Sequence, residues 1–499
     1  MPFISLPGGI SLFVEVFRAN EPLIDSSSSS TSTVDGTANA LAACTLQSGS
    51  SQGQQQQIDL SHPTLVVFSR FLGDITSREP VVQDPRVRSR FNVVCIDLRH
   101  QGRSKCPVRP EYDSSVGAAD VAFVMEALAL PPAWVYAATF TAWPVAVKLS
   151  VLFPDQVAGL IGAGITGMYA PPANLQLFRD LDVSWLTPVD EDDYEEALTG
   201  FAFCMFAEPK DVDPAIVDDN IGVLTRRYGP NKATAAYGVS HSCHYSPRLS
   251  PEFVGALRQP VLVMVGDRDP AFLLREAQES LDAFTSSTSK RLVIIPEGGH
   301  LIAANHGSTI VENLLDFTEA HVSNQQQPQQ FVQFHFHRAL RIVAQLAGDQ
   351  RILRRNVSRP ESYTMLSEDE INEATSAIQR LQDYQVKCTI RFPGSDEPET
   401  WDLESSLVGR RRRRWRYSTR HQYTPMRPES LRRSVTDSIT IAVERARAEE
   451  YDDSESCGST SVPSTPTSLS PIDPALHGSK EKDPSKRASV PFQLYQIRI

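Results

Sequence analysis

Two polar residues that each follow a short apolar run are the first candidates for chemistry. Asp269 comes shortly after the run PVLVMVG, and His300 stands behind two glycines after the run RLVII. An imidazole and a carboxylate can accept, hold and return a proton near neutral pH. Each residue also has a plainer interpretation, because turns are rich in such side chains: a hydrogen-bonded turn histidine and a loop-capping aspartate.

Histidines and cysteines elsewhere can be weighed as metal ligands. The stretch His241–His244 (HSCH) holds two imidazoles and a thiol, but its spacing matches no common zinc pattern and no second pair accompanies it. A solvent-facing or substrate-lining stretch is the preferred interpretation. The alternation in FHFH predicts a short strand with His335 and His337 on one face, and Cys95 in an apolar run predicts a packed thiol. We expect no metal and no cofactor.

The elements that must position these residues follow from hydrophobic patterning. Short apolar runs bounded by turn residues predict strands, and a 3.6-residue spacing predicts helices. The predicted strands are Ile10–Arg18, Thr64–Ser69, Phe91–Leu98, Ala133–Thr139, Val157–Ile165, Pro260–Gly266 and Arg291–Ile295, and the predicted helices are Asp113–Leu130, Val145–Phe153 and Ile310–Ala320. Strands that alternate with helices indicate an α/β protein with a mostly parallel sheet flanked by helices.

Composition sets the expected domain boundaries. Residues 1–325 are expected to form the α/β domain. A Ser-, Thr- and Gln-rich insertion at 26–57 cannot bury enough apolar surface to fix its backbone, so we expect it to be disordered. From about residue 173 to 250 the chain is acidic and helix-prone, which predicts a helical cap inserted between strands.

The remainder of the chain has a different character. Residues 326–450 are expected to form a partly ordered extension, in which Ser367 and Glu370 make a capping box at the start of an amphipathic helix that runs to Leu381. The segment Val386–Phe392 predicts a strand. Residues 451–499, rich in Ser, Thr and Pro, are expected to be a disordered tail.

Overall composition excludes several classes of protein. No apolar window of about 18 residues occurs, which argues against a membrane span, and the N-terminus lacks the basic and apolar segments of a secretory signal. The 7 cysteines are scattered and make no disulfide framework, so a reducing, cytoplasmic location is expected. The net charge of −12 is the sum of −15 over residues 1–330 (22 Lys and Arg against 37 Asp and Glu) and +3 over the remainder, so the charge of the first part does not attract nucleic acid.

One basic cluster, Arg410–Arg414, stands apart from this acidic background. A nuclear-import signal, a contact with RNA or anionic lipid, and a solvated run are all compatible with it. The targeting and solvated interpretations rank above nucleic-acid binding, which would weaken steeply with salt. Residues that resemble phosphorylation sites are Ser434, Thr465, Ser470 and Ser489. Kinases and protein partners are therefore expected to act through the tail.

Four motifs, taken in order, resemble the α/β-hydrolase superfamily. The stretch Asp97–Ser104 (DLRHQGRS) resembles the family's DLRGxGRS loop after its second core strand. Pro260–Pro270 (PVLVMVGDRDP) is similar to the strand and loop that carry the triad acid, and Ile295–His300 (IPEGGH) to the loop that carries the triad histidine. Phe153–Val157 (FPDQV) matches the end of the helix after the nucleophile. The resemblance covers roughly residues 1–320 and implies the α/β-hydrolase fold.

The resemblance also implies acyl transfer, as hydrolysis of small esters or related acyl compounds. Asp269 takes the place of the triad acid and His300 that of the general base. A hydroxyl becomes a usable nucleophile only when such a base removes its proton. The family carries a serine for this purpose on a sharp strand-to-helix turn reading G-x-S-x-G. Counting back along the following helix places Phe140 at that position, between Ala138 and Ala142, so the serine is missing.

Threonines beside Phe140 are possible replacements for the missing serine. Thr139 and Thr141 both carry hydroxyls, but the left-handed backbone of the turn disfavours β-branched side chains. A water activated directly by the histidine is the remaining option. The oxyanion donors expected from the family pattern are the backbone N–H groups of Phe71 and Thr141. The segment Ser69–Phe71 (SRF) stands where the family usually shows His-Gly, which puts one donor in doubt.

Two functions follow from these observations. The first is a hydrolase with a small-molecule acyl substrate, whose activity is impaired because Phe140 occupies the nucleophile position. The alternative is a non-catalytic ligand-binding or scaffold protein that uses the hydrolase fold and a regulated tail. The altered nucleophile and oxyanion positions favour the alternative, and the acid and histidine loops favour the hydrolase.

Overall fold

The computed structural model describes residues 3–20, 58–73, 80–165, 172–206, 214–244, 249–269, 272, 274–322 and 330–390. Four predictions fall wholly outside these residues: the low-complexity insertion at 26–57, the basic cluster Arg410–Arg414, the tail from residue 451, and the phosphorylation sites Ser434, Thr465, Ser470 and Ser489. The part of the predicted extension from residue 391 to 450 also lies outside them. None of the described helices is long and apolar enough to cross a membrane.

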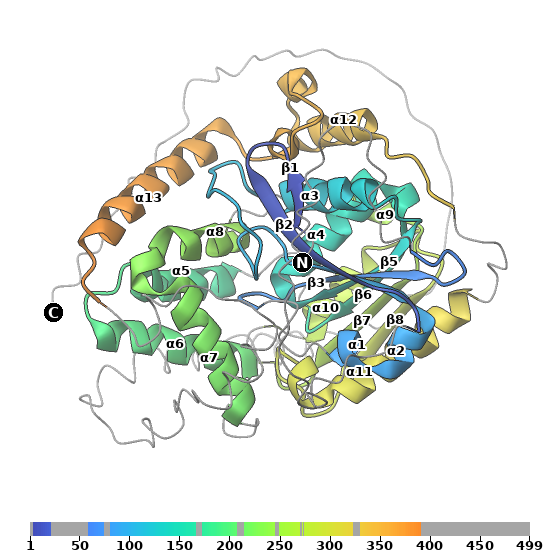
Figure 1. Ribbon diagram of the computed structural model, residues 1–499, viewed down its shortest axis with the longest axis horizontal. Helices are drawn as coiled ribbons and strands as arrows, with labels where there is room; N and C mark the ends of the chain where they lie inside the picture. Colours follow the sequence, from blue (N-terminus) through green and yellow to red (C-terminus); the bar gives the residue numbers. More distant parts are fainter. Residues whose placement is uncertain are drawn as a thin grey trace, which may run out of the picture. The chain divides into compact units, whose positions relative to one another are not determined.

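The centre of the described chain is an eight-stranded, mostly parallel sheet (Figure 1). Its strands, in sheet order, are β1 (Phe3–Leu6), β2 (Ile10–Phe17), β4 (Asn92–Ile96), β3 (Thr64–Phe68), β5 (Ala133–Ala138), β6 (Val157–Ala163), β7 (Val261–Gly266) and β8 (Lys290–Ile295). The pairs β1–β2 and β2–β4 are antiparallel, and all other pairs are parallel. The predicted α/β fold class is confirmed. Strand β1 was not predicted; it pairs with β2 across a turn in which Gly8 and Gly9 have positive φ.

Helices cover both faces of this sheet. They are α1 (Pro80–Gln83), α2 (Pro85–Arg90), α3 (Ser114–Ala127), α4 (Thr139–Leu152), α9 (Pro251–Gly255), α10 (Leu274–Asp282) and α11 (Ala303–Val322). One buried cluster joins α3 and α4 to one face of the sheet, and a second joins α1, α2 and α11 to the other. Strands buried on both faces read as continuous apolar runs, which is why the sequence showed them clearly.

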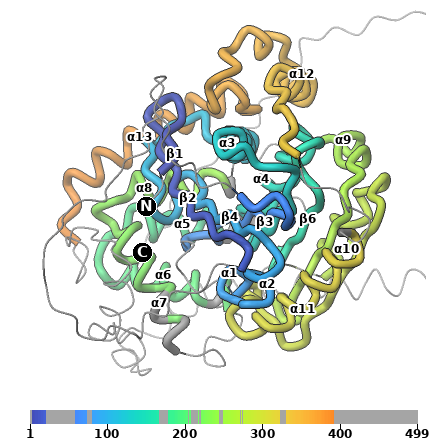
Figure 2. The backbone as a smooth tube through the Cα atoms, turned by 45° about the vertical axis from the view of Figure 1, so that its right-hand side comes forward, coloured from blue at the N-terminus to red at the C-terminus, as the bar shows by residue number. Residues whose placement is uncertain are grey.

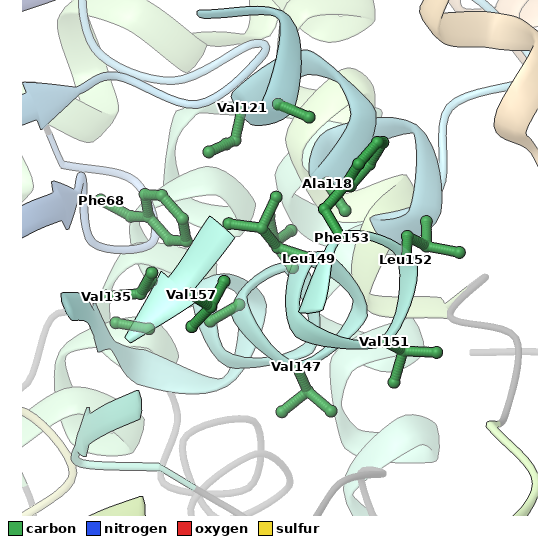
Figure 3. Packing of buried hydrophobic residues seen from close by; sticks show 14 of the residues in the cluster. Phe68, Ala118, Val121, Val135, Val147, Leu149, Val151, Leu152, Phe153 and Val157 are labelled. Carbon is green, nitrogen blue, oxygen red and sulfur yellow. The ribbon is translucent and has the colours of Figure 1, made fainter. Parts of the chain in front are cut away.

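Side chains packed around α4 fix the position of this helix, which directly follows strand β5. In Figure 3, Leu149 of α4 lies between Phe68 of β3 and Ala118 of α3. Helices α3 and α4 approach closely because Gly117 has no side chain: a Cβ there would lie 3.0 Å from Val145 Cγ2. Helix α3 itself begins at Asp113, whose Oδ1 accepts the first backbone N–H groups of the helix. Helix α4 is therefore packed closely against α3 and the sheet.

Between β6 and α9, the described residues include four helices that form an insertion. These are α5 (Pro172–Leu186), α6 (Glu191–Phe206), α7 (Pro214–Tyr228) and α8 (Ala233–His244). They share an apolar cluster in which Trp185, Tyr194 and Phe201 are buried. This cluster also takes in Phe71, Leu301 and Leu381 from outside the insertion. The predicted helical character of this segment is confirmed.

The C-terminal extension, residues 330–390, adds two helices, α12 (Phe336–Ala347) and α13 (Glu368–Lys387). The predicted capping box is confirmed: Glu370 N–H donates to Ser367 Oγ, and Glu370 Oε2 accepts the Ser367 N–H. The predicted strand at Val386–Phe392 is wrong in its first two residues, which continue α13, and residues 388–390 form no strand. The apolar face of α13 packs on the inserted helices, so the helix extends as far as that contact does.

The predicted strand at FHFH is also wrong. His335 is the N-cap of α12 and Phe336 is its first residue. The alternation of Phe and His has another cause, because both phenylalanines pack against aromatic residues of the domain. The Phe336 ring stacks on the Phe123 ring with 4.4 Å between their centroids, and the centroid of the Phe334 ring lies 5.9 Å from that of Phe153. Aromatic anchoring therefore produced a strand-like pattern.

The extension contacts two separate parts of the fold (Figures 1 and 2). Near α3, Asp113 Oδ2 accepts the Met365 N–H over 2.8 Å. At the inserted helices, Tyr384 Oη donates to the Pro188 carbonyl over 2.8 Å, and Gln385 Oε1 accepts from the Thr234 hydroxyl over 3.0 Å. One continuous segment thus ties the sheet domain to the inserted helices.

Candidate active site

The predicted site residues lie at one edge of the sheet. Strands β5, β7 and β8 are parallel, so their carboxyl ends meet at the same edge, where ligands of open α/β sheets bind. Thr139 directly follows β5, Asp269 follows β7, and His300 follows β8. These three residues are the starting point for the chemistry.

Asp269 and His300 are in direct contact. The distance from His300 Nδ1 to Asp269 Oδ2 is 2.8 Å, and each side chain is only 4% exposed. A carboxylate at Nδ1 favours the tautomer that carries its proton there, which leaves Nε2 as the proton acceptor. The geometry is that of an oriented general base, and the turn and loop-cap interpretations alone would not require this contact.

Close contacts with neighbouring backbone hold the loop that carries His300, here called the histidine loop. A Cβ on Gly164, at the end of β6, would overlap the carbonyl oxygen of His300, and Gly164 has a φ of 59°. The Leu301 N–H donates to the carbonyl of Met205 in α6 over 2.8 Å. The Phe272 ring lies 5.0 Å from the imidazole. The loop is therefore fixed by the sheet on one side and by an inserted helix on the other.

The sharp turn after β5 falls on Thr139, not on Phe140. Thr139 has a φ of 73°, in the left-handed region that a β-branched residue adopts only under constraint. Ala138 still pairs with Ala163 of β6, so the strand runs through Ala138 and the reversal comes one residue later. The positive φ therefore lies one position before Phe140, where counting back along the helix places the turn. The elbow reads Ala-Ala-Thr-Phe-Thr and carries a hydroxyl at its centre.

A backbone donor faces that hydroxyl. The Phe71 N–H, in the turn after β3, donates to Thr139 Oγ1 over 3.2 Å. We call residues 69–73 the oxyanion turn. In the family pattern the second oxyanion donor is the backbone N–H of the residue after the elbow, which is Phe140 when Thr139 stands at the elbow. This N–H belongs to the first turn of α4, where N–H groups lack intrahelical acceptors. Thr141, expected as this donor, is instead a buried residue one position further along α4.

A buried ion cluster beside this turn was missed by reasoning from sequence. Residues 98–102, here called the arginine turn, carry Arg99, whose guanidinium bonds Asp120 of α3 through two nitrogens at 2.8 and 2.7 Å. A third nitrogen lies 3.2 Å from Glu361 Oε1 of the extension. Burial raises the pKa of Asp120, and the positive charge of Arg99 opposes that rise. Only the resemblance to DLRGxGRS marked Arg99, and nothing local marked its partners.

His100 replaces the glycine of that family loop. Its φ is 65°, and its ring lies 5.1 Å from the Tyr112 ring. Gly238 of α8 leaves room for the ring, because a Cβ there would lie 2.8 Å from His100 Cγ. Burial first, and then the charge of Arg99 and the proximity of His241, lower the pKa of His100 to about 3. His100 therefore remains neutral near physiological pH and packs against the inserted helices.

The other weighed ligands lie apart from these groups or inside the core. Cys95 is fully buried among apolar side chains, as predicted. His241 is buried in α8, 5.1 Å from the Tyr237 ring. Within the described ranges, no group of three or more His, Cys, Asp or Glu side chains is arranged to hold a metal ion.

Comparisons with known proteins agree with this architecture. Residues 63–306 match the family model described as alpha/beta hydrolase fold. No curated protein sequence matches the chain. Similar solved structures include a carboxylesterase of the thaumarchaeon Nitrososphaera gargenis (15% identity, 65% of this chain and 100% of that one, TM-score 0.48) and an enol-lactonase of Burkholderia xenovorans LB400 (14% identity, 64% and 100%, TM-score 0.47). Another is Est816, an N-acyl homoserine lactone degrading enzyme (17% identity, 63% and 100%, TM-score 0.44).

The family match spans β3 to the start of α11, the segment that carries the elbow, the acid loop and the histidine loop. The parallel pairing of β3 to β8 agrees with the mostly parallel sheet that the sequence predicted. Residues 63–306 of this chain therefore belong to the α/β-hydrolase fold family.

Proposed function

We propose that the chain hydrolyses small carboxylic esters or related acyl compounds with Thr139 as nucleophile. The observation that carries the proposal is the elbow itself. A hydroxyl stands at the residue with left-handed φ, and a backbone N–H from the oxyanion turn lies within hydrogen-bond distance of it. His300 and Asp269, 2.8 Å apart at the same sheet edge, supply an oriented base.

In the first step His300 Nε2 takes the proton of the Thr139 hydroxyl while its oxygen bonds to the substrate carbonyl carbon. Asp269 stabilises the imidazolium that results. The carbonyl oxygen becomes an oxyanion and accepts hydrogen bonds from the N–H groups of Phe71 and Phe140. The tetrahedral intermediate then collapses, the bond to the alcohol breaks, and the alcohol leaves with the proton held by His300.

The second step removes the acyl group from Thr139. His300 takes a proton from a water molecule, whose oxygen attacks the acyl carbon at the same site. The carboxylic acid leaves as the bond to Thr139 Oγ1 breaks, and His300 returns the proton to the threonine. In this scheme helices α5–α8 act as the cap, because the Leu301 to Met205 bond brings α6 to the histidine loop.

The test is turnover of p-nitrophenyl acetate and butyrate by the full-length chain and four variants. Thr139→Ala and His300→Ala are expected to lower kcat by at least about 10³-fold, because each removes a member of the triad. Thr139→Ser is expected to retain or raise kcat, since it keeps the hydroxyl and relieves the β-branched strain. Thr141→Ala is the matched control, a neighbouring threonine that is expected to leave kcat within about threefold.

A covalent probe makes the assignment independent of rate. A fluorophosphonate should label the parent on the peptide that contains Thr139, and Thr139→Ala should abolish the label. Activity gained only by Phe140→Ser would overturn the elbow register, and activity lost in Thr141→Ala but kept in Thr139→Ala would overturn the nucleophile.

One observation favours the non-catalytic alternative. The bond from the Phe71 N–H to Thr139 Oγ1 occupies a donor that a tetrahedral oxyanion needs. A protein built only to bind an acyl compound tolerates this arrangement. That function predicts that the parent and Thr139→Ser both turn over no ester, while a small acyl ligand such as butyrate raises the Tm of the parent in a saturable way.

A further inference from the structure

The oxyanion turn is bonded at both of its ends to the arginine turn. At the first end, the Leu98 N–H donates to Ser69 Oγ over 3.1 Å. At the other, the Gly102 N–H donates to the Gly73 carbonyl over 3.1 Å. The Phe71 N–H lies between these two bonds. The position of this donor therefore depends on where the arginine turn is held.

The Arg99 guanidinium is one of the groups that hold the arginine turn; another is the Tyr228 hydroxyl, which donates to the His100 carbonyl over 2.9 Å. Arg99 is completely buried, and its planar fork reaches Asp120 on one side and Glu361 on the other. Asp120 belongs to the family domain. Glu361 belongs to the C-terminal extension, beyond the residues matched by the family model. The extension thus supplies one of the two carboxylates that neutralise Arg99.

The segment of backbone that carries Glu361 is itself well anchored. It sits in a single helical turn, Pro360–Tyr363, whose tyrosine ring is fully buried and donates from its hydroxyl to the Val357 carbonyl over 2.9 Å. Directly after it, the Met365 N–H bonds Asp113 at the N-terminus of α3. These contacts fix Glu361 relative to α3 without involving Arg99, so the residue can act as a fixed support.

We infer that Glu361 is a positioning residue for the Phe71 oxyanion donor, acting through Arg99 and the arginine turn. The inference rests on the proposed function, because an oxyanion donor has a role only if an oxyanion forms. Donors of this kind stabilise the transition state more than the bound ester, so a displaced donor lowers kcat and leaves KM nearly unchanged. The extension would then be a working part of the catalytic domain.

The test begins with Glu361→Gln in the full-length chain, which keeps the shape and removes the charge. We expect kcat for p-nitrophenyl butyrate to fall about tenfold with KM within about twofold, both in the parent and in the Thr139→Ser background. The matched control is Glu368→Gln. Glu368 belongs to the same extension and pairs with Arg351 at 2.7 Å, but both side chains are exposed and neither contacts the arginine turn. This control should leave kcat unchanged.

A second variant interrupts the same path without touching the extension. Ser69→Ala removes the oxygen that accepts the Leu98 N–H, and it should lower kcat by a similar factor. If Glu361 acts through this bond, the double variant Glu361→Gln with Ser69→Ala will be less impaired than the product of the two single effects. Two independent, fully multiplicative effects would overturn the inference.

Hydrogen exchange gives a readout that does not need turnover. Glu361→Gln should speed amide exchange of the peptide containing residues 69–73 about tenfold at a temperature well below its Tm, and Glu368→Gln should not. Unchanged exchange, or a lowered Tm with unchanged kcat, would overturn the inference. Faster exchange together with no turnover in the parent and in Thr139→Ser would instead overturn the proposed hydrolysis and leave the link between Glu361 and the oxyanion turn established.

Discussion

Two buried ion pairs in this protein look alike in distance but differ in what they can do. His300 and Asp269 are 2.8 Å apart at the end of β8, and Arg99 and Asp120 are 2.7 Å apart at the arginine turn. Both pairs are almost completely buried. An imidazole can give up its proton near neutral pH, whereas a guanidinium stays charged. The first pair can therefore move a proton, and the second can only hold a position.

The partners of the two pairs differ in the same way. Asp269 is the carboxylate that bonds the imidazole nitrogen Nδ1. Arg99 bonds two carboxylates, Asp120 through two nitrogens and Glu361 through the third. A buried pair of opposite charges does not by itself indicate catalysis. Whether such a pair can take part in catalysis depends on whether one of its groups can gain or lose a proton near neutral pH, and on what the second nitrogen of that group can reach.

The largest expected effect breaks the first pair. Asp269→Asn should lower kcat about 10⁴-fold, because an amide stabilises the wrong tautomer of His300 and cannot support the imidazolium. Stability should change much less, so the loss is measured as kcat on an activated ester with Tm recorded in parallel. Asp267→Asn, two residues earlier in the same loop and exposed, is the control. Comparable activity in the two variants would remove the proton-transfer role assigned to Asp269.

Breaking the second pair should affect stability more than chemistry. Arg99→Ala leaves the carboxylates of Asp120 and Glu361 buried without their cation, which typically costs about 3 to 5 kcal/mol in the free energy of unfolding. Urea unfolding measures this. The control is Arg351→Ala: Arg351 also pairs with two carboxylates, Asp349 and Glu368, but on the surface, so no resolvable change is expected. Equal losses in both variants would contradict the role of burial.

Acid should destabilise the protein through His100, which lies in the arginine turn. Its pKa is about 3 when folded against about 6.5 when unfolded. Between these values the unfolded chain binds the extra proton, so stability is complete above about pH 6.5 and is lost as the pH falls. The contribution is about 1.4 kcal/mol per pH unit in that window.

This contribution is isolated by a variant that fits the same backbone. His100→Gly accepts the φ of 65° and removes the imidazole, so its free energy of unfolding should fall less steeply between pH 6 and pH 4 than that of the parent. His337→Asn, at an exposed position of α12, should keep the parent slope. Identical slopes in all three proteins would show that His100 does not titrate as its burial requires.

The smallest expected effect lies far from both pairs. Ser367→Ala removes the capping box of α13 and should cost about 1 kcal/mol in the free energy of unfolding, with kcat unchanged. Ser376→Ala, in the exposed middle of the same helix, should change stability by only a few tenths of a kcal/mol. Suppose Ser367→Ala lowers the free energy of unfolding by as much as Arg99→Ala does. An exposed helix cap would then stabilise the protein as strongly as the buried ion cluster, and the expected ranking of the two would be wrong.

Much of the fold could be predicted from sequence because its signals are local. Parallel strands buried on both faces give uninterrupted apolar runs, and all seven predicted strands of the α/β domain are present. The capping box at Ser367 and the helical character of the inserted segment are equally local. The two wrong strands, at FHFH and at Val386–Phe392, arose where packing against a distant surface, not backbone pairing, set the pattern.

The sequence by itself determined the α/β sheet and the order of its motifs, because buried strands and the loops after them give short-range patterns. Its resemblance to the α/β-hydrolase superfamily implied Asp269 and His300 as the candidate acid and base. Only the tertiary structure decided the elbow register, since the last residue of β5 is defined by its pairing with β6 and not by the length of α4. It also decided the partners of Arg99. The bond to Glu361 joins residues 262 positions apart, and no local preference encodes a contact whose energy arises only when both side chains leave water together.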